Sequence, residues 1–322
     1  MNQHETESAL EERAFHRDLI NRLSFAALAE QRRSRRWGIF FKVLTFTYLI
    51  VVTVILFQGQ QLQKLTASTT EHTALVEIKG VIAEDSRANA EDVIASLRDA
   101  FEDEGVKGVI VEINSPGGSP VQSAYIYDEL RRLRQQNPEI PLHAVIADIG
   151  ASGGYYIAVG AENIYVNPSS IIGSIGVRMD SFGFTESMKK LGVERRLYTA
   201  GVNKGGLDPF LPEKEGDVEH VKGVLTEVHQ QFITAVKAGR GARLGQNPDL
   251  FSGLFWSGER GVALGLADGL GDRHFVAREI IGAKKIVSYT HTPDLLARFA
   301  ERVGTALSQQ LHQQWTAQLT LQ

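Results

Sequence analysis

A serine framed by glycines is the residue with the clearest chemical potential in this chain. Ser152 lies in the run Gly150-Ala-Ser-Gly-Gly154, after an apolar stretch typical of a buried strand (144–149) and before one typical of a short buried helix (155–161). Glycines permit turn conformations that are closed to other residues. The serine is therefore expected at a helix start, where free N–H groups such as that of Gly153 favour an attacking oxygen and a developing oxyanion. A plain helix N-cap is the alternative role for the same serine.

A second glycine pair follows another predicted strand (106–113). Gly117 and Gly118 come directly after Pro116, which makes the turn rigid. Because glycine admits close approach, backbone N–H groups at this turn could face an incoming carbonyl. The pair is a candidate oxyanion hole, and an ordinary Pro-Gly-Gly turn is the alternative.

The hydroxyl of a serine is a weak nucleophile and needs a base. The chain has nine histidines, and none of them lies in a glycine-rich or otherwise suggestive setting. Lys204 differs, because it lies among glycines and apolar residues with no acidic residue following it before Asp208. Burial on substrate binding or on assembly of several copies could remove its proton. A solvated loop lysine is the alternative.

The elements around these residues alternate between strands and helices. This order predicts an α/β fold with a largely parallel sheet. Strands are predicted at 75–80, 106–113, 141–149 and 163–166, and helices at 90–101, 121–136 and 213–238. The last helix carries one apolar stripe, made of Val218, Val221, Leu225, Val228, Phe232 and Val236.

An apolar run at residues 37–57 predicts a membrane anchor. A helix of about 20 residues is roughly 30 Å long, which matches the hydrocarbon core of a bilayer. Four arginines just upstream predict a cytoplasmic N-terminus, so the rest of the chain is expected outside the cytoplasm, at an inner membrane. We divide the chain into a cytosolic segment (1–36), a transmembrane helix (37–57), a linker (58–73), a peptidase domain (74–288) and an amphipathic tail (289–322).

Composition narrows the chemistry further. The 322 residues carry a net charge of −4 and no basic, aromatic-interleaved patch, which argues against a nucleic-acid partner. The chain has no cysteine, so disulfides, zinc–thiolate sites and a cysteine nucleophile are excluded. We expect no metal and no cofactor.

Four blocks together resemble the signal peptide peptidase A (SppA) family, in its short, single-copy form. They are Gly150-Ala-Ser-Gly-Gly-Tyr-Tyr156, Asn114-Ser-Pro-Gly-Gly118, Gly173-Ser-Ile-Gly176 and Thr199-Ala-Gly-Val-Asn-Lys204. The resemblance covers about residues 74–285. It implies a ClpP/crotonase-like fold of repeated ββα units and a membrane-anchored Ser–Lys peptidase. The long N-terminal segment and the tail depart from the family pattern.

The resemblance also assigns roles to residues. It implies that Ser152 is the nucleophile, Lys204 the general base, and Ser174 the hydroxyl that orients the lysine. It implies that Gly118, together with Gly117, donates to the oxyanion. It further implies a homo-oligomeric ring in which neighbouring protomers share each active site, acting without a cofactor on apolar peptides such as remnant signal peptides in the bilayer.

Three other functions remain open at this point. An α/β-hydrolase esterase would also contain Gly150-Ala-Ser-Gly-Gly154 and would need a later Asp and His, for example Asp268 and His274. A non-catalytic membrane scaffold of the same fold is the second. Acyl-CoA binding is the third.

Overall fold

The computed structural model describes residues 35–52 and 70–291, which fall into two compact units divided between Thr66 and Ala67. In the first unit, residues 35–52 form a helix whose side chains are almost all exposed. Within the described ranges no helix is both long and apolar enough to cross a bilayer. Residues 53–57 of the predicted membrane helix, the segment 1–34, most of the predicted linker and the tail from 292 onward lie outside the described residues.

The second unit is built on a sheet with β3 at its centre. The strand order is β6-β5-β3-β2-β1-β8, and off this path β4 pairs with β3 and β7 pairs with β4. Every pair is parallel except β5–β6. The strands are β1 (His72–Lys79), β2 (Val106–Ser115), β3 (Leu142–Ala151), β4 (Asn163–Val166), β5 (Ile171–Gly173), β6 (Phe255–Ser257), β7 (Gly269–Leu270) and β8 (Ile286–Ser288). This confirms the predicted α/β class with a largely parallel core.

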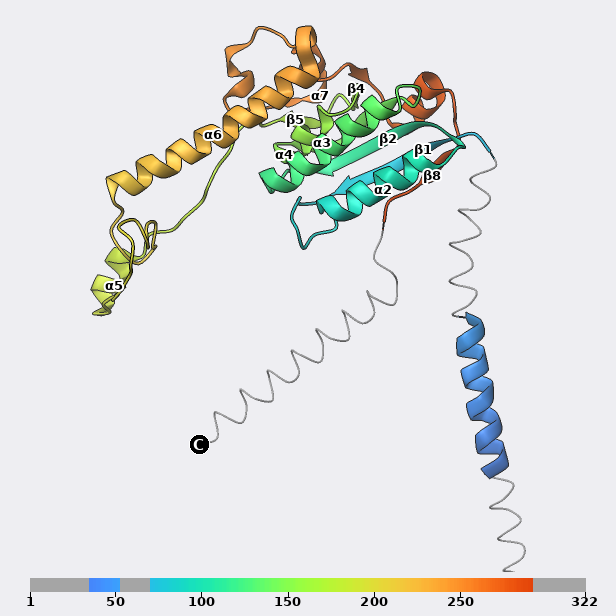
Figure 1. The fold of residues 1–322 in the computed structure, drawn as a ribbon, viewed down its shortest axis with the longest axis horizontal. Coiled ribbons are helices and arrows are strands. Elements are labelled where there is room, and N and C mark those ends of the chain that lie inside the picture. The colour runs from blue at the N-terminus through green and yellow to red at the C-terminus, as the bar shows by residue number, and fades with distance from the viewer. Residues whose placement is uncertain (1–34, 53–69, 292–322) are drawn as a thin grey trace, which may run out of the picture. The chain divides into compact units, whose positions relative to one another are not determined.

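The helices connect and cover these strands, and Figure 1 shows α2 and α3 lying on one face of the sheet. They are α2 (Ala90–Glu102), α3 (Pro120–Gln136), α4 (Gly153–Ala158), α5 (Thr185–Leu191), α6 (Glu215–Arg240), α7 (Gly258–Ala263) and α8 (Arg273–Phe275). Short turns of other helix types span Gly241–Arg243, Pro248–Phe251 and Val276–Ile281. Asn89 caps α2 and Ser119 caps α3, each accepting a hydrogen bond from a backbone N–H of the first turn.

The main hydrophobic core lies between the sheet and helices α2, α3 and α4. A smaller cluster on the opposite face joins Leu75, Ile110 and Val145 to Val276 and Ala277. The long apolar strands β1, β2 and β3 are thus buried on both faces over much of their length, as expected of parallel strands. This packing anchors β2 and β3, the strands that lead into the two glycine turns.

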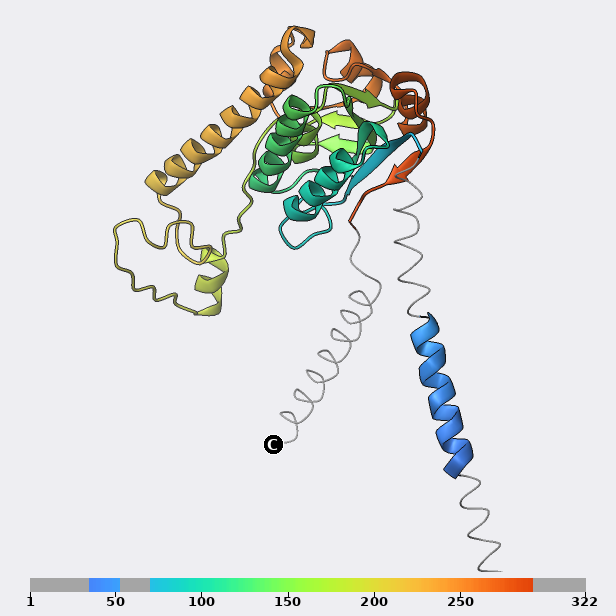
Figure 2. The ribbon, with the colours of Figure 1, turned by 45° about the vertical axis from the view of Figure 1, so that its right-hand side comes forward.

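Residues 178–231 form an extension that we call the arm. Helix α6 buries only Phe232, Ala235, Val236 and Arg240, all in its last third, and α5 buries no residue at all. Of the predicted apolar stripe on α6, Val218, Val221, Leu225 and Val228 are only half-buried. Figures 1 and 2 both show α5 and its neighbouring loops at the far end of α6, away from the sheet.

Candidate active site

Ser152 occupies the sharp turn between β3 and α4. Its backbone has φ 52° and ψ −121°, a conformation that costs a non-glycine residue about 1–3 kcal/mol. The turn is fixed because the Ser152 N–H donates to the Gly173 carbonyl at 2.8 Å and its own carbonyl accepts from the Tyr156 N–H at 2.9 Å. The residue is half-buried, and the structure gives its hydroxyl no hydrogen-bond partner among the described residues. Ser152 thus occupies the N-cap position of α4 without a capping bond from its side chain.

The Pro-Gly-Gly turn lies directly against this serine. A Cβ atom built on Gly117 would lie 2.7 Å from the Gly153 nitrogen and 2.8 Å from Ser152 Cβ, so only glycine allows the approach. The two strand-to-helix junctions, far apart in sequence, therefore meet at the ends of β2 and β3. The structure brings Gly117, Gly118 and Gly153 together beside Ser152.

The N–H groups of these glycines differ in what they bind. The Gly117 N–H donates to Ser115 Oγ at 3.1 Å. The N–H groups of Gly118 and Gly153 donate no hydrogen bond within the described part of the chain. Two unengaged donors next to a serine hydroxyl are the arrangement that stabilises a tetrahedral oxyanion.

Ser174 is placed next to this turn by strand pairing. Ala151 of β3 pairs with Gly173 of β5. Ser152 and Ser174 are the next residues of the two chain segments, so both lie just beyond the same end of these neighbouring strands. Ser174 also has a positive φ, 51°. Ser152 and Leu207 are the only other non-glycine residues with a positive φ in the described part of the chain. Its N–H donates to the Leu254 carbonyl at 2.8 Å, which anchors it to the segment before β6.

Lys204 lies elsewhere in the same chain. It is exposed on the arm, in a turn where its N–H donates to the Gly201 carbonyl at 3.1 Å, and its ammonium has no ion pair among the residues described. Within one chain the structure does not bring Lys204 to Ser152, since the end of the arm lies away from α4 (Figures 1 and 2).

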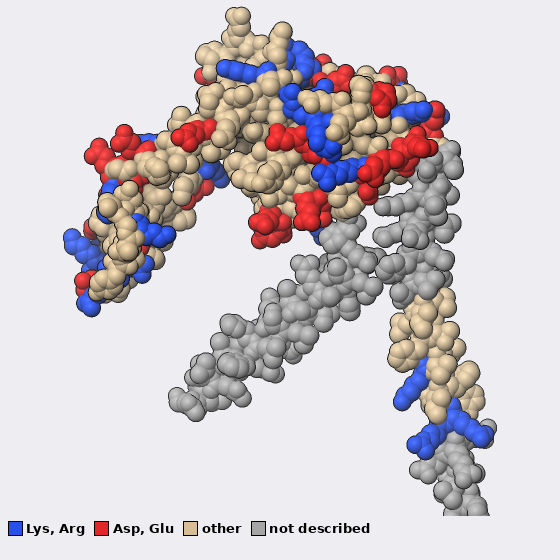
Figure 3. All heavy atoms as spheres, in the orientation of Figure 1, with Lys and Arg blue, Asp and Glu red and all other residues tan. Residues whose placement is uncertain are grey.

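Two strongly exposed apolar side chains lie close to Lys204 in the sequence of the arm. Tyr198 is 88% exposed and Val202 is 96% exposed. The fold of the arm's end is nevertheless defined, because Phe184 stacks on Phe210 at 5.5 Å and Arg195 binds Asp208 at 3.1 Å. Figure 3 shows basic side chains prominent at this end of the arm.

The acid of the possible esterase triad has a structural role instead. The Asp268 carboxylate binds Arg240 at 2.7 Å and Arg243 at 3.0 Å. Burial opposes ionisation of Asp268, but hydrogen bonds from Arg240 and from the Ile164 N–H hold its pKa below the ordinary value. Ile164 pairs with Ala144, roughly 25 Å along β3 from Ser152 at about 3.3 Å per residue. Asp268 therefore lies at the wrong end of the strand to orient a histidine beside Ser152.

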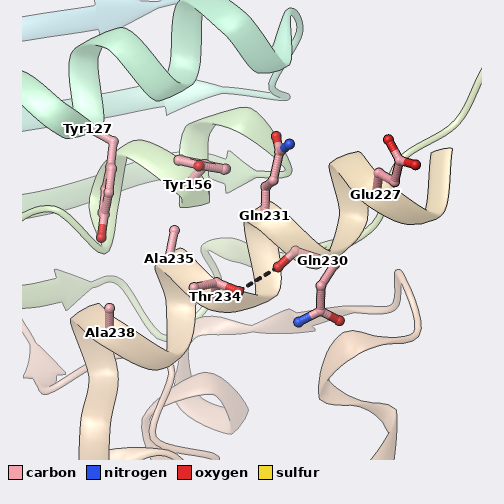
Figure 4. A pocket seen from close by; sticks show the side chains of 8 residues that line it. All are labelled: Tyr127, Tyr156, Glu227, Gln230, Gln231, Thr234, Ala235 and Ala238. Atoms are coloured by element: carbon pink, nitrogen blue, oxygen red, sulfur yellow. Dashed lines mark hydrogen bonds between the residues drawn. The ribbon is translucent and has the colours of Figure 1, made fainter. Parts of the chain in front are cut away.

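A hollow of about 520 Å³ lies between α6 and the helices α3 and α4 (Figure 4). It is lined by Tyr127, Tyr156, Glu227, Gln230, Gln231, Thr234, Ala235 and Ala238. Tyr156 stacks on Phe232 at 4.8 Å, which helps to fix the last third of α6 on the body. The hollow includes none of the predicted catalytic residues. Across the described ranges, no group of three or more His, Cys, Asp or Glu side chains could hold a metal ion.

Sequence reasoning missed two residues of this site. Ser115 lies within a quoted motif, but no role was expected for its hydroxyl. Ile82 contributes only backbone groups, so its side chain gives no sequence signal. Both hold the Pro-Gly-Gly turn, as described below.

Comparison with known proteins points in the same direction as the geometry. Residues 134–286 match the model of peptidase family S49. A Synechocystis protein provisionally named a protease is 31% identical over 207 residues, which cover 63% of this chain and 71% of that protein. An Enterococcus faecium protein provisionally named signal peptide peptidase SppA is 28% identical over 223 residues, 67% of this chain and 64% of its own length.

A further relative is named for a different activity. A Brucella abortus protein named Na(+)/H(+) antiporter NhaA is 51% identical over 188 residues, 58% of this chain. The match spans only 25% of that longer protein.

A hydroxyl on a strained strand-to-helix turn, beside unengaged N–H groups, is the arrangement expected of an acyl-transfer site on an α/β sheet. With the family match, the chain belongs to peptidase family S49, the SppA family.

Proposed function

We propose that the protein is a serine endopeptidase in which Ser152 of one copy works with Lys204 of another. The observation that carries the proposal is the Ser152 turn, where a positive φ marks a strained backbone and the neighbouring N–H groups of Gly118 and Gly153 are unengaged among the described residues. Membership of the S49 family supports peptide-bond hydrolysis, and a ClpP/crotonase-like arrangement of the sheet is part of the proposal.

The mechanism follows from the chemistry of these groups. Neutral Lys204 takes the proton of Ser152 while Oγ attacks the scissile carbonyl. The N–H groups of Gly118 and Gly153 stabilise the resulting oxyanion. The lysinium then protonates the leaving amine, and water hydrolyses the acyl-enzyme with Lys204 again as base. Ser174, at the same level of the sheet as Ser152, would orient the lysine amine.

The second copy is needed because the arm carries Lys204 away from its own sheet. The apolar residues next to Lys204 support the same arrangement, because Tyr198 and Val202 are almost fully exposed in one chain. Seating the arm on a neighbouring copy would bury them. The same contact would remove water from the amine and favour its neutral form. Repeating this contact around a symmetric assembly gives a homo-oligomeric ring.

We further propose that an anchor at residues 37–57 holds the peptidase on the outer side of an inner membrane. The support is the apolar sequence of this run and the arginines before it. An enzyme at a bilayer meets apolar peptides, and remnant signal peptides are such substrates. The provisional name of the Enterococcus relative agrees with this substrate class.

The test uses the full chain in detergent with a fluorophosphonate probe that labels activated serines. We expect labelling of the native protein, none of Ser152→Ala, and a loss of most labelling in Lys204→Ala. Lys190→Ala is the matched control, because Lys190 is also an exposed arm lysine without an ion pair among the described residues. Cleavage of a synthetic signal peptide should follow the same order. Labelling of Lys204→Ala at the native rate would refute the Ser–Lys pair.

A further inference from the structure

The loop that carries the oxyanion donor is held from two sides. On one side, the Gly117 carbonyl accepts from the Ile82 N–H at 2.9 Å, and the Ile82 carbonyl accepts from the Ser119 N–H at 2.8 Å. On the other side, Ser115 Oγ accepts from the Gly117 N–H at 3.1 Å. Each of the two peptide planes that precede the Gly118 Cα is thus tied by one hydrogen bond.

The Ile82 contact sets the direction of the donor. In a trans peptide the carbonyl and the N–H point in opposite directions. Because the Gly117 carbonyl is bound to Ile82, the Gly118 N–H points away from Ile82. The site for a Cβ atom on Gly153 lies 3.3 Å from the Gly118 nitrogen, so this N–H faces the Ser152 turn. A Cβ on Gly118 itself would lie 2.1 Å from the Ile82 carbonyl oxygen, so no other residue fits.

The Ser115 contact holds the preceding peptide plane. Ser115 is the last residue of β2, is completely buried, and pairs with Gly150 of β3. Its hydroxyl therefore extends from a buried strand end that is paired with β3. Gly117 is buried too, so without Ser115 Oγ its N–H would be unpaired and the Pro116–Gly117 peptide would be free to rotate.

We infer that Ser115 is a positioning residue for peptide hydrolysis, whose hydroxyl holds the Pro116–Gly117 peptide and, together with the Ile82 contact, keeps the Gly118 N–H directed toward the oxyanion. Ser115 touches neither the substrate nor Ser152 Oγ in this role. It acts through the Gly117 N–H, and it makes Gly118 rather than Gly117 the donor of this loop. The inference rests on the proposed function, because it assigns a role within the same site.

The test compares Ser115→Ala with Ser96→Ala in the full-length protein. Ser96 is a matched control, because it is also buried and its Oγ also accepts a backbone N–H, that of His291 at 2.9 Å, far from Ser152. Both variants lose one buried hydroxyl acceptor, so both should melt at a lower temperature. Only Ser115→Ala should lose turnover, by roughly tenfold or more, since removing an oxyanion donor outright costs about 10²–10³ in kcat. We expect KM to change by less than about twofold, because the donor acts on the transition state.

The outcomes separate this inference from the proposed function. If the native protein is not labelled at Ser152 by a fluorophosphonate, the proposed function itself fails. If the native protein is labelled and Ser115→Ala has native kcat while melting like Ser96→Ala, only the positioning role fails. Should Ser115→Ala not fold, Ser115→Cys keeps a side chain of similar shape with a weak sulfur acceptor and serves for the same comparison. An intermediate kcat for this variant supports the role, and a native kcat overturns it.

Discussion

At the scale of single residues, the site depends on glycines, because a side chain at these positions would clash with the neighbouring backbone or side chains. Gly153 provides one of the two unengaged N–H groups, and α3 leaves it almost no space. A Cβ on Gly153 would lie 2.4 Å from Ser123 Oγ. Ser123 is fully buried and donates to the Ser119 carbonyl at 2.9 Å, so its hydroxyl is itself part of the frame around the oxyanion loop.

We therefore expect Gly153→Ala to reduce turnover and to lower the free energy of unfolding by about 1–3 kcal/mol, as overpacking usually does. Ser123→Ala in the same chain removes the nearest atom and should restore part of the lost stability. A double-mutant cycle on melting temperature and kcat measures this coupling. Purely additive effects would show that the two side chains do not compete for one space.

At the scale of elements, α2 and α3 are joined by a carboxylate with two arginine partners. Glu129 on α3 binds Arg132 of its own helix at 2.6 Å and Arg98 of α2 at 2.7 Å. The hydrogen bond from Arg132, reinforced by Arg98 and opposed by burial, lowers the pKa of Glu129 from 4.5 to about 2. The carboxylate thus helps to hold the two helices that cover the sheet below the site.

A lowered carboxyl pKa adds stability above the unfolded-state value and loses it as the pH falls. Glu129→Gln should therefore reduce the free energy of unfolding by about 1–2 kcal/mol at pH 7, a range that allows for solvent around both arginines. The difference from the native protein should shrink between pH 4.5 and about 2, where the native carboxyl becomes protonated. Urea unfolding at several pH values measures it. Asp128→Asn, an exposed neighbour on α3, is the control, and an equal pH dependence in both variants would contradict this account.

The elements near Ser152 were predictable because their signals are local. The predicted strands at 106–113 and 141–149 became β2 and β3 with ends shifted by one or two residues, since alternation of apolar residues and glycine turns mark them directly. The engagement of the Gly117 N–H by Ser115 was not predictable. It depends on the rotation of one peptide plane, which leaves no trace in residue types. The Ile82 clamp is hidden for the same reason, because any residue supplies an N–H and a carbonyl.

At the scale of the whole molecule, the dominant feature is that the two residues of the proposed Ser–Lys pair lie on different parts of one chain, Ser152 on the body and Lys204 on the arm. The four sequence blocks indicated which residues belong together, but residue types alone do not say that Lys204 lies on an extension whose buried contacts with the body are concentrated in the last third of α6. That placement follows from tertiary packing, in which Phe232, Ala235 and Val236 are buried and the earlier stripe residues are not.

A shared site predicts complementation between two inactive variants. Ser152→Ala and Lys204→Ala should each be inactive alone, while co-expressed chains that assemble together should recover about a quarter of native peptidase activity, because random mixing gives one site in four both native groups. Peptide cleavage by the purified mixture is the measurement. A mixture as inactive as its components would mean that each site takes both groups from one chain.

The arm has a consequence for the moment of synthesis. If the hydroxyl and the amine always come from separate chains, a newly made single chain cannot cleave peptides. At low concentrations of the protein, the rate of peptide cleavage then rises more steeply than the concentration itself. Dilution would then switch the enzyme off without any inhibitor, and a high local concentration of chains would switch it on.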